Sequence, residues 1–210
     1  MKKVLQDQLN NTFIRGYEVP NTLCDEIIQV FYETGNKVLG TIGTQNKIGL
    51  DRNIKESVDI GVNQKLIDQF PCLRKYTDYL FSFCNDYINS EFTFCVDVNN
   101  SLGIKENFNI QWYPPGGGYK TWHCERNNLS NEPFKSRKLV FMTYLNDVKE
   151  ERATDGGTEF FYQNLSIKAI KGLTLLWPVE WMYTHRGIVA PTKEKIITTG
   201  WFSYMEDSHE

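Results

Sequence analysis

The chain has 210 residues, of which 40% are hydrophobic, 14% aromatic and 23% charged, and its formal net charge at pH 7 is −3. This composition is typical of a soluble globular protein with a sizeable core. The slightly acidic balance gives no general attraction to nucleic acid. No apolar run approaches the ~20 residues that a membrane helix needs, and no apolar segment follows the two lysines at the start. We therefore expect neither a membrane span nor a secretory signal.

The cysteines point to a reducing compartment. There are five of them, an odd number, and no two form a CxxC pair. Free thiols of this kind are typical of proteins that carry no disulfide framework. The expected location is therefore the cytoplasm.

The first part of the chain carries helical patterns. Apolar residues fall on one helical face within residues 23–31, with Asn21 or Thr22 as a candidate N-cap and Gly35 as a stop. Two further helices are predicted over residues 63–70 and 73–89, separated at Pro71, because proline disfavours helix in the residue before it. Residues 39–63 are polar and dotted with glycine, which predicts a mobile segment with one strand.

The pattern changes at about residue 92. From there, short runs rich in aromatic and β-branched residues alternate with turn residues, which is typical of an antiparallel sandwich or barrel. The predicted class is α+β, mainly β, with a double-stranded β-helix (jelly-roll) core and N-terminal supporting helices. We expect a single domain over residues 1–210, in which a helical part, residues 1–91, packs on a jelly-roll core, residues 92–204.

A candidate metal-binding pair follows the glycine-rich turn of the segment QWYPPGGGYKTWHCE. His123 and Glu125 lie two residues apart, and on a strand such side chains point to the same face. An imidazole nitrogen and a carboxylate oxygen are two ligands for a divalent metal. An H-x-E pair is common by chance, so a third ligand and its surroundings decide whether this is a site.

Two histidines remain as third ligand. His185 follows the strand-like run LTLLWP, whereas His209 lies in the polar end EDSHE, where a chain is usually disordered. We therefore favour His185. Two histidines and one carboxylate form the facial triad of non-haem Fe(II) oxygenases, which leaves positions open for a cosubstrate and dioxygen.

A lysine ten residues after His185 supports this interpretation. Lys195 lies in the strand-like run EKIITTGW, and Thr199 and Trp201 share its strand face by alternation. A 2-oxoacid bound to iron needs a cation for its distal carboxylate, and Lys195 is favoured for this over Lys193 by its spacing. A solvent-exposed strand lysine is the more common situation. Tyr113, ten residues before His123, is equally well explained as a core aromatic.

Taken in order, these features resemble the 2-oxoglutarate- and Fe(II)-dependent dioxygenases, and most closely the prolyl 4-hydroxylase-like group. The family pattern runs Y-x9-H-x-D, a YLN strand, a GG turn, H-x9-(R/K) and a tryptophan. The chain matches it over about residues 108–202, with TYLND at 143–147 and DGGTEFF at 155–161. One departure is Glu125, which stands where the family usually has Asp.

The resemblance implies an enzyme that hydroxylates an unactivated C–H bond, with a prolyl residue of a peptide or protein as substrate. It assigns the Fe(II) ligands His123, Glu125 and His185. It assigns the cosubstrate-binding residues Lys195, Thr199 and Tyr113, with Thr143 and Trp201 as further candidates. Fe(II), 2-oxoglutarate and O2 are the implied cofactors, with ascorbate as a reductant. Arg126 and Arg186, each one residue after a ligand, are candidates for substrate contact or solvated arginines.

Alternatives remain open from the sequence. A free amino acid or another small molecule is an alternative substrate. The same three ligands are compatible with a zinc hydrolase that uses a metal-bound water, although Lys195 has no evident role there. A non-catalytic metal-binding jelly-roll module is the third possibility, because a fold alone does not determine chemistry.

Overall fold

The computed structural model describes the chain except residues 1, 44–47, 95–100, 127–134 and 206–210. Its main helices are α2 (Asn21–Glu33), α3 (Gln64–Gln69) and α4 (Pro71–Asp86), preceded by the single-turn α1 (Gln6–Leu9). Helix α2 begins one residue earlier than expected, since Pro20 occupies the N-cap position. The Asn63 side chain accepts the N–H of Leu66 and caps α3. Pro71 opens α4, where its missing N–H removes no helical hydrogen bond.

The main β-sheet is antiparallel and crosses the whole molecule. Its strand order is β1-β2-β14-β11-β16-β9-β7-β3, and β8 pairs with β16 off this path. The strands are β1 (Lys3–Val4), β2 (Arg15–Glu18), β14 (Leu173–Pro178), β11 (Arg137–Tyr144), β16 (Lys195–Tyr204), β9 (Phe108–Tyr113), β7 (Val58–Val62), β3 (Val38–Leu39) and β8 (Leu102–Gly103).

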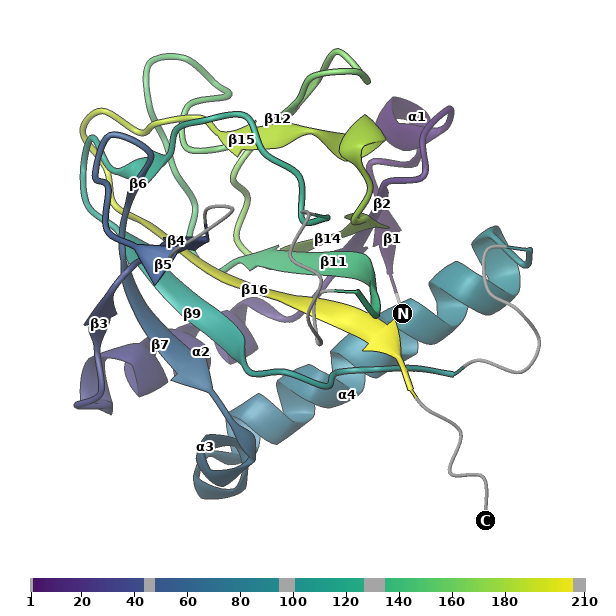
Figure 1. The fold of residues 1–210 in the computed structure, drawn as a ribbon, viewed down its shortest axis with the longest axis horizontal. Coiled ribbons are helices and arrows are strands. Elements are labelled where there is room, and N and C mark those ends of the chain that lie inside the picture. Colours follow the sequence, from purple (N-terminus) through teal and green to yellow (C-terminus); the bar gives the residue numbers. More distant parts are fainter. Residues whose placement is uncertain (1, 44–47, 95–100, 127–134, 206–210) are drawn as a thin grey trace.

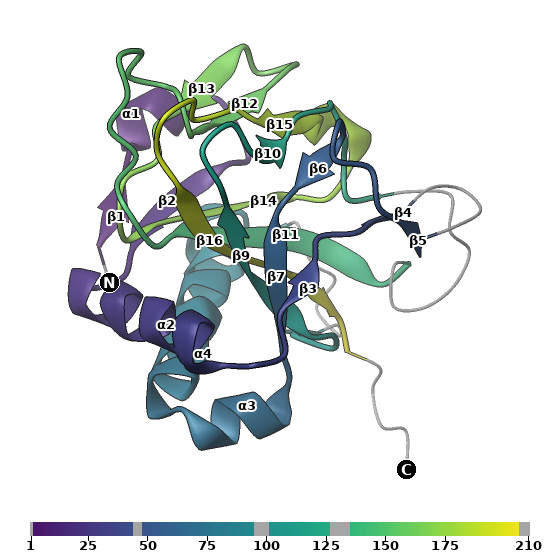
Figure 2. The same cartoon turned by 90° about the vertical axis from the view of Figure 1, so that its left-hand side faces the viewer.

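A second layer of short strands covers one face of this sheet. It contains β13 (Leu165–Ile167), β12 (Thr158–Phe160) and β15 (His185–Gly187), with β10 (Gly118–Tyr119) paired to β6 (Lys55–Glu56) nearby. A small hairpin, β4 (Ile42–Gly43) and β5 (Ile48–Gly49), completes the strands. Figure 2 shows this layer above the main sheet and helices α2, α3 and α4 below it. The predicted jelly roll with supporting helices is thus confirmed.

Two apolar cores lie on the two faces of the main sheet. On the helix side, Phe141 of β11 and Phe202 of β16 pack with residues of α2 and α4. Between the layers, Met142 of β11 and Ile197 of β16 pack with Phe160 of β12. Since side chains alternate along a strand, this division shows which face each residue of β11 and β16 occupies.

Three expectations about the first half of the chain need correction. Residues 39–63 hold more than one strand, because β7 is an integral strand of the main sheet and β6 pairs with β10. The N-terminal part is also more than a helical support, since β1, β2 and β7 complete the same sheet as β9, β11 and β16. Residues 92–94 form no strand, and the rest of that predicted run lies outside the described residues.

Two observations bear on the surroundings of the protein. In the part of the chain that the structure describes, no helix combines the length and apolar character required to cross a membrane. Among the described cysteines, Cys24, Cys72 and Cys124 are free thiols.

Candidate metal centre

Three side chains distant in sequence meet between the two layers. His123 and His185 exchange two backbone hydrogen bonds of 2.9 and 2.8 Å, which place their rings side by side. Oε1 of Glu125 lies 3.7 Å from Nε2 of each histidine. Within the described ranges these residues form the one group of three potential metal ligands, with ligand atoms within 4.8 Å of one another. His123 and Glu125 converge as predicted, although a single bridge rather than a regular strand holds them.

Hydrogen bonds determine which nitrogen of each histidine is free. Nδ1 of His123 lies 2.9 Å from the Thr121 carbonyl, and Nδ1 of His185 lies 2.9 Å from the Tyr183 carbonyl. A carbonyl oxygen only accepts, so each Nδ1 carries the proton and each Nε2 presents a lone pair. Burial lowers the pKa of His123 to about 4 and lowers the pKa of His185 too. Both imidazoles are therefore neutral near pH 7, the form that binds a metal.

Aromatic rings hold both imidazoles in place. Tyr119 stacks on His123 with ring centroids 3.7 Å apart, and Trp177 meets His185 edge to face at 5.1 Å. Two neutral, oriented imidazoles and one carboxylate are the donor set of a facial triad, so the residues present fit Fe(II). His209, the rival third ligand, lies outside the described residues.

The second oxygen of Glu125 faces away from the histidines. Its Oε2 accepts a 3.0 Å hydrogen bond from Nε1 of Trp201 and lies 4.0 Å from Nη1 of Arg137. Trp201 was predicted to bind the cosubstrate, which stays a prediction, and in the structure its indole N–H contacts the candidate ligand Glu125. Arg137 was missed because a bulge between Arg137 and Leu139 turns its side chain to the inner face of β11, and the sequence gives no signal of that bulge.

Lys195 is a buried cation without an acidic partner. It opens β16 opposite Tyr113, is 5% exposed, and its Nζ lies 5.0 Å from the centroid of the Tyr113 ring. A Cβ on Gly187, two residues after His185, would lie 3.4 Å from this Nζ, so the ammonium reaches the strand that carries a ligand. Burial lowers the pKa of Lys195 to about 8. No carboxylate of the described residues forms an ion pair with it.

A second buried lysine, Lys55, differs from Lys195 because it forms an ion pair with a carboxylate. Nζ of Lys55 lies 2.7 Å from Oδ2 of Asp59, which also accepts the Nε2 of Gln111 at 3.0 Å. An unpaired buried charge is costly. Lys195 differs from Lys55 in that no carboxylate of the described residues pairs with it.

The other predicted cosubstrate residues lie in different places. Thr199 faces the space between the layers by alternation from Lys195, where it pairs in register with Asn109 and Met142. Tyr113 is buried, and its hydroxyl donates a 2.7 Å hydrogen bond to Oε1 of Gln111. The single proton of that hydroxyl is therefore committed within the protein in this conformation.

The structure does not bring Thr143 to the site. Its hydroxyl bonds Tyr76 of α4 at 2.8 Å and Thr174 at 2.7 Å, on the helix side of the sheet. The neighbouring Tyr144 occupies the inner face instead, opposite Ile197, and bonds the Thr158 hydroxyl at 2.6 Å. Tyr144 thus lies on the inner face of β11, between the two layers. Strand alternation would have indicated this position if the sequence had shown which residues of β11 face inward.

The remaining candidates lie at the surface with their own partners. Lys193 is exposed, and its backbone N–H donates to Glu150. Arg126 pairs with Glu180, and Arg186 pairs with Glu159. These contacts match solvated, locally paired arginines.

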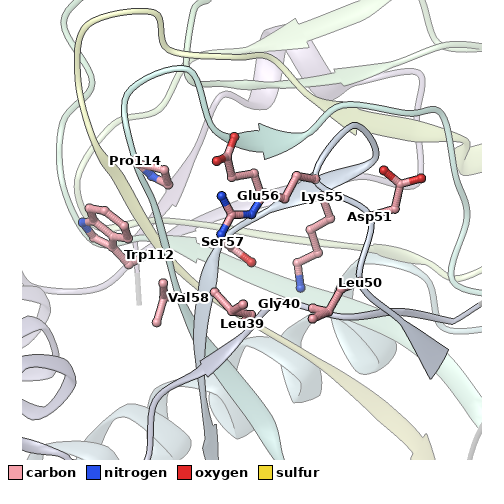
Figure 3. Close-up of a pocket in the computed structure, with 11 residues that line it drawn as sticks. Leu39, Gly40, Leu50, Asp51, Lys55, Glu56, Ser57, Val58, Trp112 and Pro114 are labelled. Carbon is pink, nitrogen blue, oxygen red and sulfur yellow. The ribbon is translucent and has the colours of Figure 1, made fainter.

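A separate pocket lies where β6 turns into β7 (Figure 3). Leu39, Leu50 and Trp112 line it together with Lys55 and Ser57, and it contains none of the three candidate ligands. Its volume is about 170 Å³, below the roughly 300–1,000 Å³ of typical ligand sites. We do not assign the chemistry to it.

Comparisons with known proteins agree with this geometry. Residues 108–203 match the family model of the 2OG-Fe(II) oxygenase superfamily, a range that contains every predicted site residue. No curated protein matches the chain.

Solved prolyl hydroxylases share the fold of nearly the whole chain. A Pseudomonas putida prolyl-4-hydroxylase matches with a TM-score of 0.67 at 16% identity, covering 94% of this chain and 96% of that one. The viral collagen prolyl hydroxylase of Paramecium Bursaria Chlorella virus-1 gives 0.65 at 17% identity, with coverages of 93% and 98%. A Trichoplax adhaerens prolyl hydroxylase gives 0.68 at 18% identity, with coverages of 94% and 86%.

The family expectation from the sequence is therefore confirmed, and with it the cofactors Fe(II), 2-oxoglutarate and O2 that this family implies. At 16–18% identity the solved structures bear on the fold alone. Residues 108–203 thus match the 2OG-Fe(II) oxygenase superfamily, and the chain has the fold of the solved prolyl hydroxylases.

Proposed function

We propose that this oxygenase hydroxylates a prolyl residue in a peptide or protein, with His123, Glu125 and His185 as the iron ligands. The observation that carries the cosubstrate assignment is the unpaired buried ammonium of Lys195 beside the ligand strand β15. A zinc hydrolase or a binding module has no use for such a cation, whereas the distal carboxylate of 2-oxoglutarate requires one.

The substrate assignment is supported by the neighbours in fold. The Trichoplax adhaerens structure is described as a complex with a peptide fragment of the hypoxia inducible factor oxygen degradation domain. The other two neighbours are named as prolyl hydroxylases. A peptide substrate for this chain is the natural extension of these likenesses.

The residues of the chain divide the work as follows. The Nε2 atoms of His123 and His185 and Oε1 of Glu125 would hold the iron, and Lys195 would pair with the distal carboxylate, assisted by the Thr199 hydroxyl. Bound iron supplies the chemistry that couples decarboxylation of 2-oxoglutarate to succinate and CO2 with insertion of one oxygen atom into the substrate. Buried aromatic rings such as Phe160 and Tyr113 exclude water from this space.

A two-stage assay tests the proposal. Succinate release from 2-oxoglutarate with Fe(II) under air should occur, slowly without substrate and faster with it. Prolyl peptides and free amino acids are then screened by mass spectrometry for the gain of one oxygen atom. Hydroxylation of a free amino acid but of no peptide would replace the prolyl-peptide assignment, and no succinate under any condition would contradict the enzyme assignment.

We predict that 2-oxoglutarate binding weakens at alkaline pH. The pKa of Lys195 is about 8 in the free protein, so the ammonium that must face the carboxylate is charged below that pH and is lost above it. Because the bound anion raises this pKa, affinity should be level below pH 8 and then fall by about tenfold per pH unit. Anaerobic titration with 2-oxoglutarate at several pH values measures this.

Lys195→Arg is the matched control for this pH profile. Arginine stays charged throughout the range, so its profile should not show the fall above pH 8 even if its absolute affinity differs. If the 2-oxoglutarate affinity of the parent protein does not fall above pH 8 either, Lys195 does not bind the cosubstrate.

We also propose a cytoplasmic location, which the free thiol of Cys24 in the buried core supports. Ascorbate as a reductant belongs to the same proposal, on the family resemblance.

A further inference from the structure

The two oxygens of the Glu125 carboxylate have different surroundings. Oε1 faces the two imidazoles, at 3.7 Å from each Nε2, whereas Oε2 accepts the indole N–H of Trp201 at 3.0 Å. The side chain is only 17% exposed, so water competes little for either oxygen. The position of the carboxylate is therefore set by Trp201 before any metal binds.

Trp201 is itself held in place. The Arg137 guanidinium lies over its ring, with its central carbon 3.4 Å from the ring centroid. Arg137 is in turn fixed by a two-pronged ion pair with Glu106, in which its Nε lies 2.6 Å from Oε1 and its Nη2 bonds Oε2. The series Glu106–Arg137–Trp201–Glu125 thus leads to the candidate metal centre, with each member contacting the next.

We propose that Trp201 and Arg137 are positioning residues that fit this site to a glutamate ligand. The proposal rests on the metal site of the proposed function. An aspartate at position 125 is one methylene shorter, so its carboxylate would retreat by about 1.5 Å. It cannot then keep both the 3.0 Å bond to Trp201 and the approach to the two imidazoles. The length of the Glu125 side chain and the position of the Trp201 indole therefore suit each other.

The chemistry gives Trp201 a defined effect. With Oε2 engaged by the indole N–H, Oε1 is the oxygen left for a metal. Hydrogen bonds that orient a ligating carboxylate change metal affinity by about 10- to 100-fold when they are removed. The cation of Arg137, 4.0 Å from Oε2, also attracts the carboxylate and helps to hold it in place.

A double-mutant cycle on Mn(II) binding tests the pairing. Mn(II) affinity is measured by calorimetry under anaerobic conditions for the parent, Glu125→Asp, Trp201→Phe and the double variant, with thermal unfolding as a check of the fold. Phenylalanine keeps a ring under Arg137 but removes the N–H. We expect about a tenfold or larger loss for each single variant, and a distinctly smaller loss from Glu125→Asp when Trp201 is already Phe.

Trp177 supplies the matched control. It packs against His185 in the same interior, but no group of the described residues forms a hydrogen bond with its Nε1. Trp177→Phe therefore removes an indole N–H without removing a bond to a ligand, and its effect should simply add to that of Glu125→Asp.

Each result decides something different. Additive losses for Trp201→Phe and Glu125→Asp, or parent-like Mn(II) affinity in Glu125→Asp, would overturn the pairing while leaving the metal site in place. Absence of Mn(II) binding by the parent protein would overturn the metal site of the proposed function, and the pairing with it.

Discussion

His185→Ala is expected to abolish Fe(II)-dependent succinate formation. The imidazole supplies one of three ligand atoms that lie within 4.8 Å of one another, and two ligands hold a divalent ion far less well than three. Since loss of a mere supporting contact to a ligand costs about 10- to 100-fold, loss of the ligand itself should exceed 100-fold in metal affinity. Calorimetric Mn(II) titration and succinate assays on the same preparation measure both effects.

Two controls make this result specific. Arg186→Ala removes the next side chain, which pairs with Glu159 on the outside, and should keep most of the Mn(II) affinity. His209→Ala tests the rival histidine and should be silent. Loss of metal binding in His209→Ala with retention in His185→Ala would show that the third ligand is His209.

The inner face of β16 was predictable because the strand is regular. Simple alternation places Lys195, Thr199 and Trp201 together, and the structure has all three on the face that packs with Ile197. The spacing of His123 and Glu125 was equally informative, since a single bridge to His185 holds the two in the extended geometry that an H-x-E pair requires.

The face of β11 was not predictable, because the phase of a strand depends on tertiary packing. The run KLVFMTYLN is apolar on both faces, so nothing in it shows whether Thr143 or Tyr144 points inward. In the structure Thr143 lies on the helix side of the sheet, in a hydrogen-bonded cluster of four hydroxyls with Tyr76, Thr174 and Thr198. Both faces of this strand are covered, and periodicity carries no signal there.

The one strand expected within residues 39–63 could not be located at β7, for an electrostatic reason. Its Asp59 is a charged residue that ordinarily indicates a surface, yet it is 7% exposed because Lys55 and Ser57 satisfy both of its oxygens at 2.7 Å. Such pairing is invisible in the sequence until the fold brings the partners together. The polar composition of residues 39–63 thus has two sources, which are exposed loop residues and the buried ion pair of Lys55 and Asp59.

Lys195→Ala is expected to weaken 2-oxoglutarate binding by about ten- to a hundredfold, since a hydrogen bond to a charged group contributes about 1.5–3 kcal/mol. The upper end is favoured because the deletion leaves a carboxylate unpaired in a space where Lys195 is 5% exposed. Mn(II) affinity should change little, because Lys195 is not among the three grouped ligands. Anaerobic titration of the Fe(II)-loaded protein, followed by the charge-transfer absorbance of the iron–cosubstrate complex, measures the effect.

Lys193→Ala is the matched control, two residues away in the same segment. Its side chain is exposed and its backbone N–H, which the substitution keeps, donates to Glu150, so 2-oxoglutarate affinity should match the parent. Both variants lose one positive charge. A difference in their 2-oxoglutarate affinities therefore reflects the burial and the location of the lysine, and not the change in net charge. Two results would contradict this prediction: parent-like 2-oxoglutarate binding by Lys195→Ala, or a larger loss of affinity in Lys193→Ala. Either result would show that the distal carboxylate of 2-oxoglutarate does not pair with Lys195.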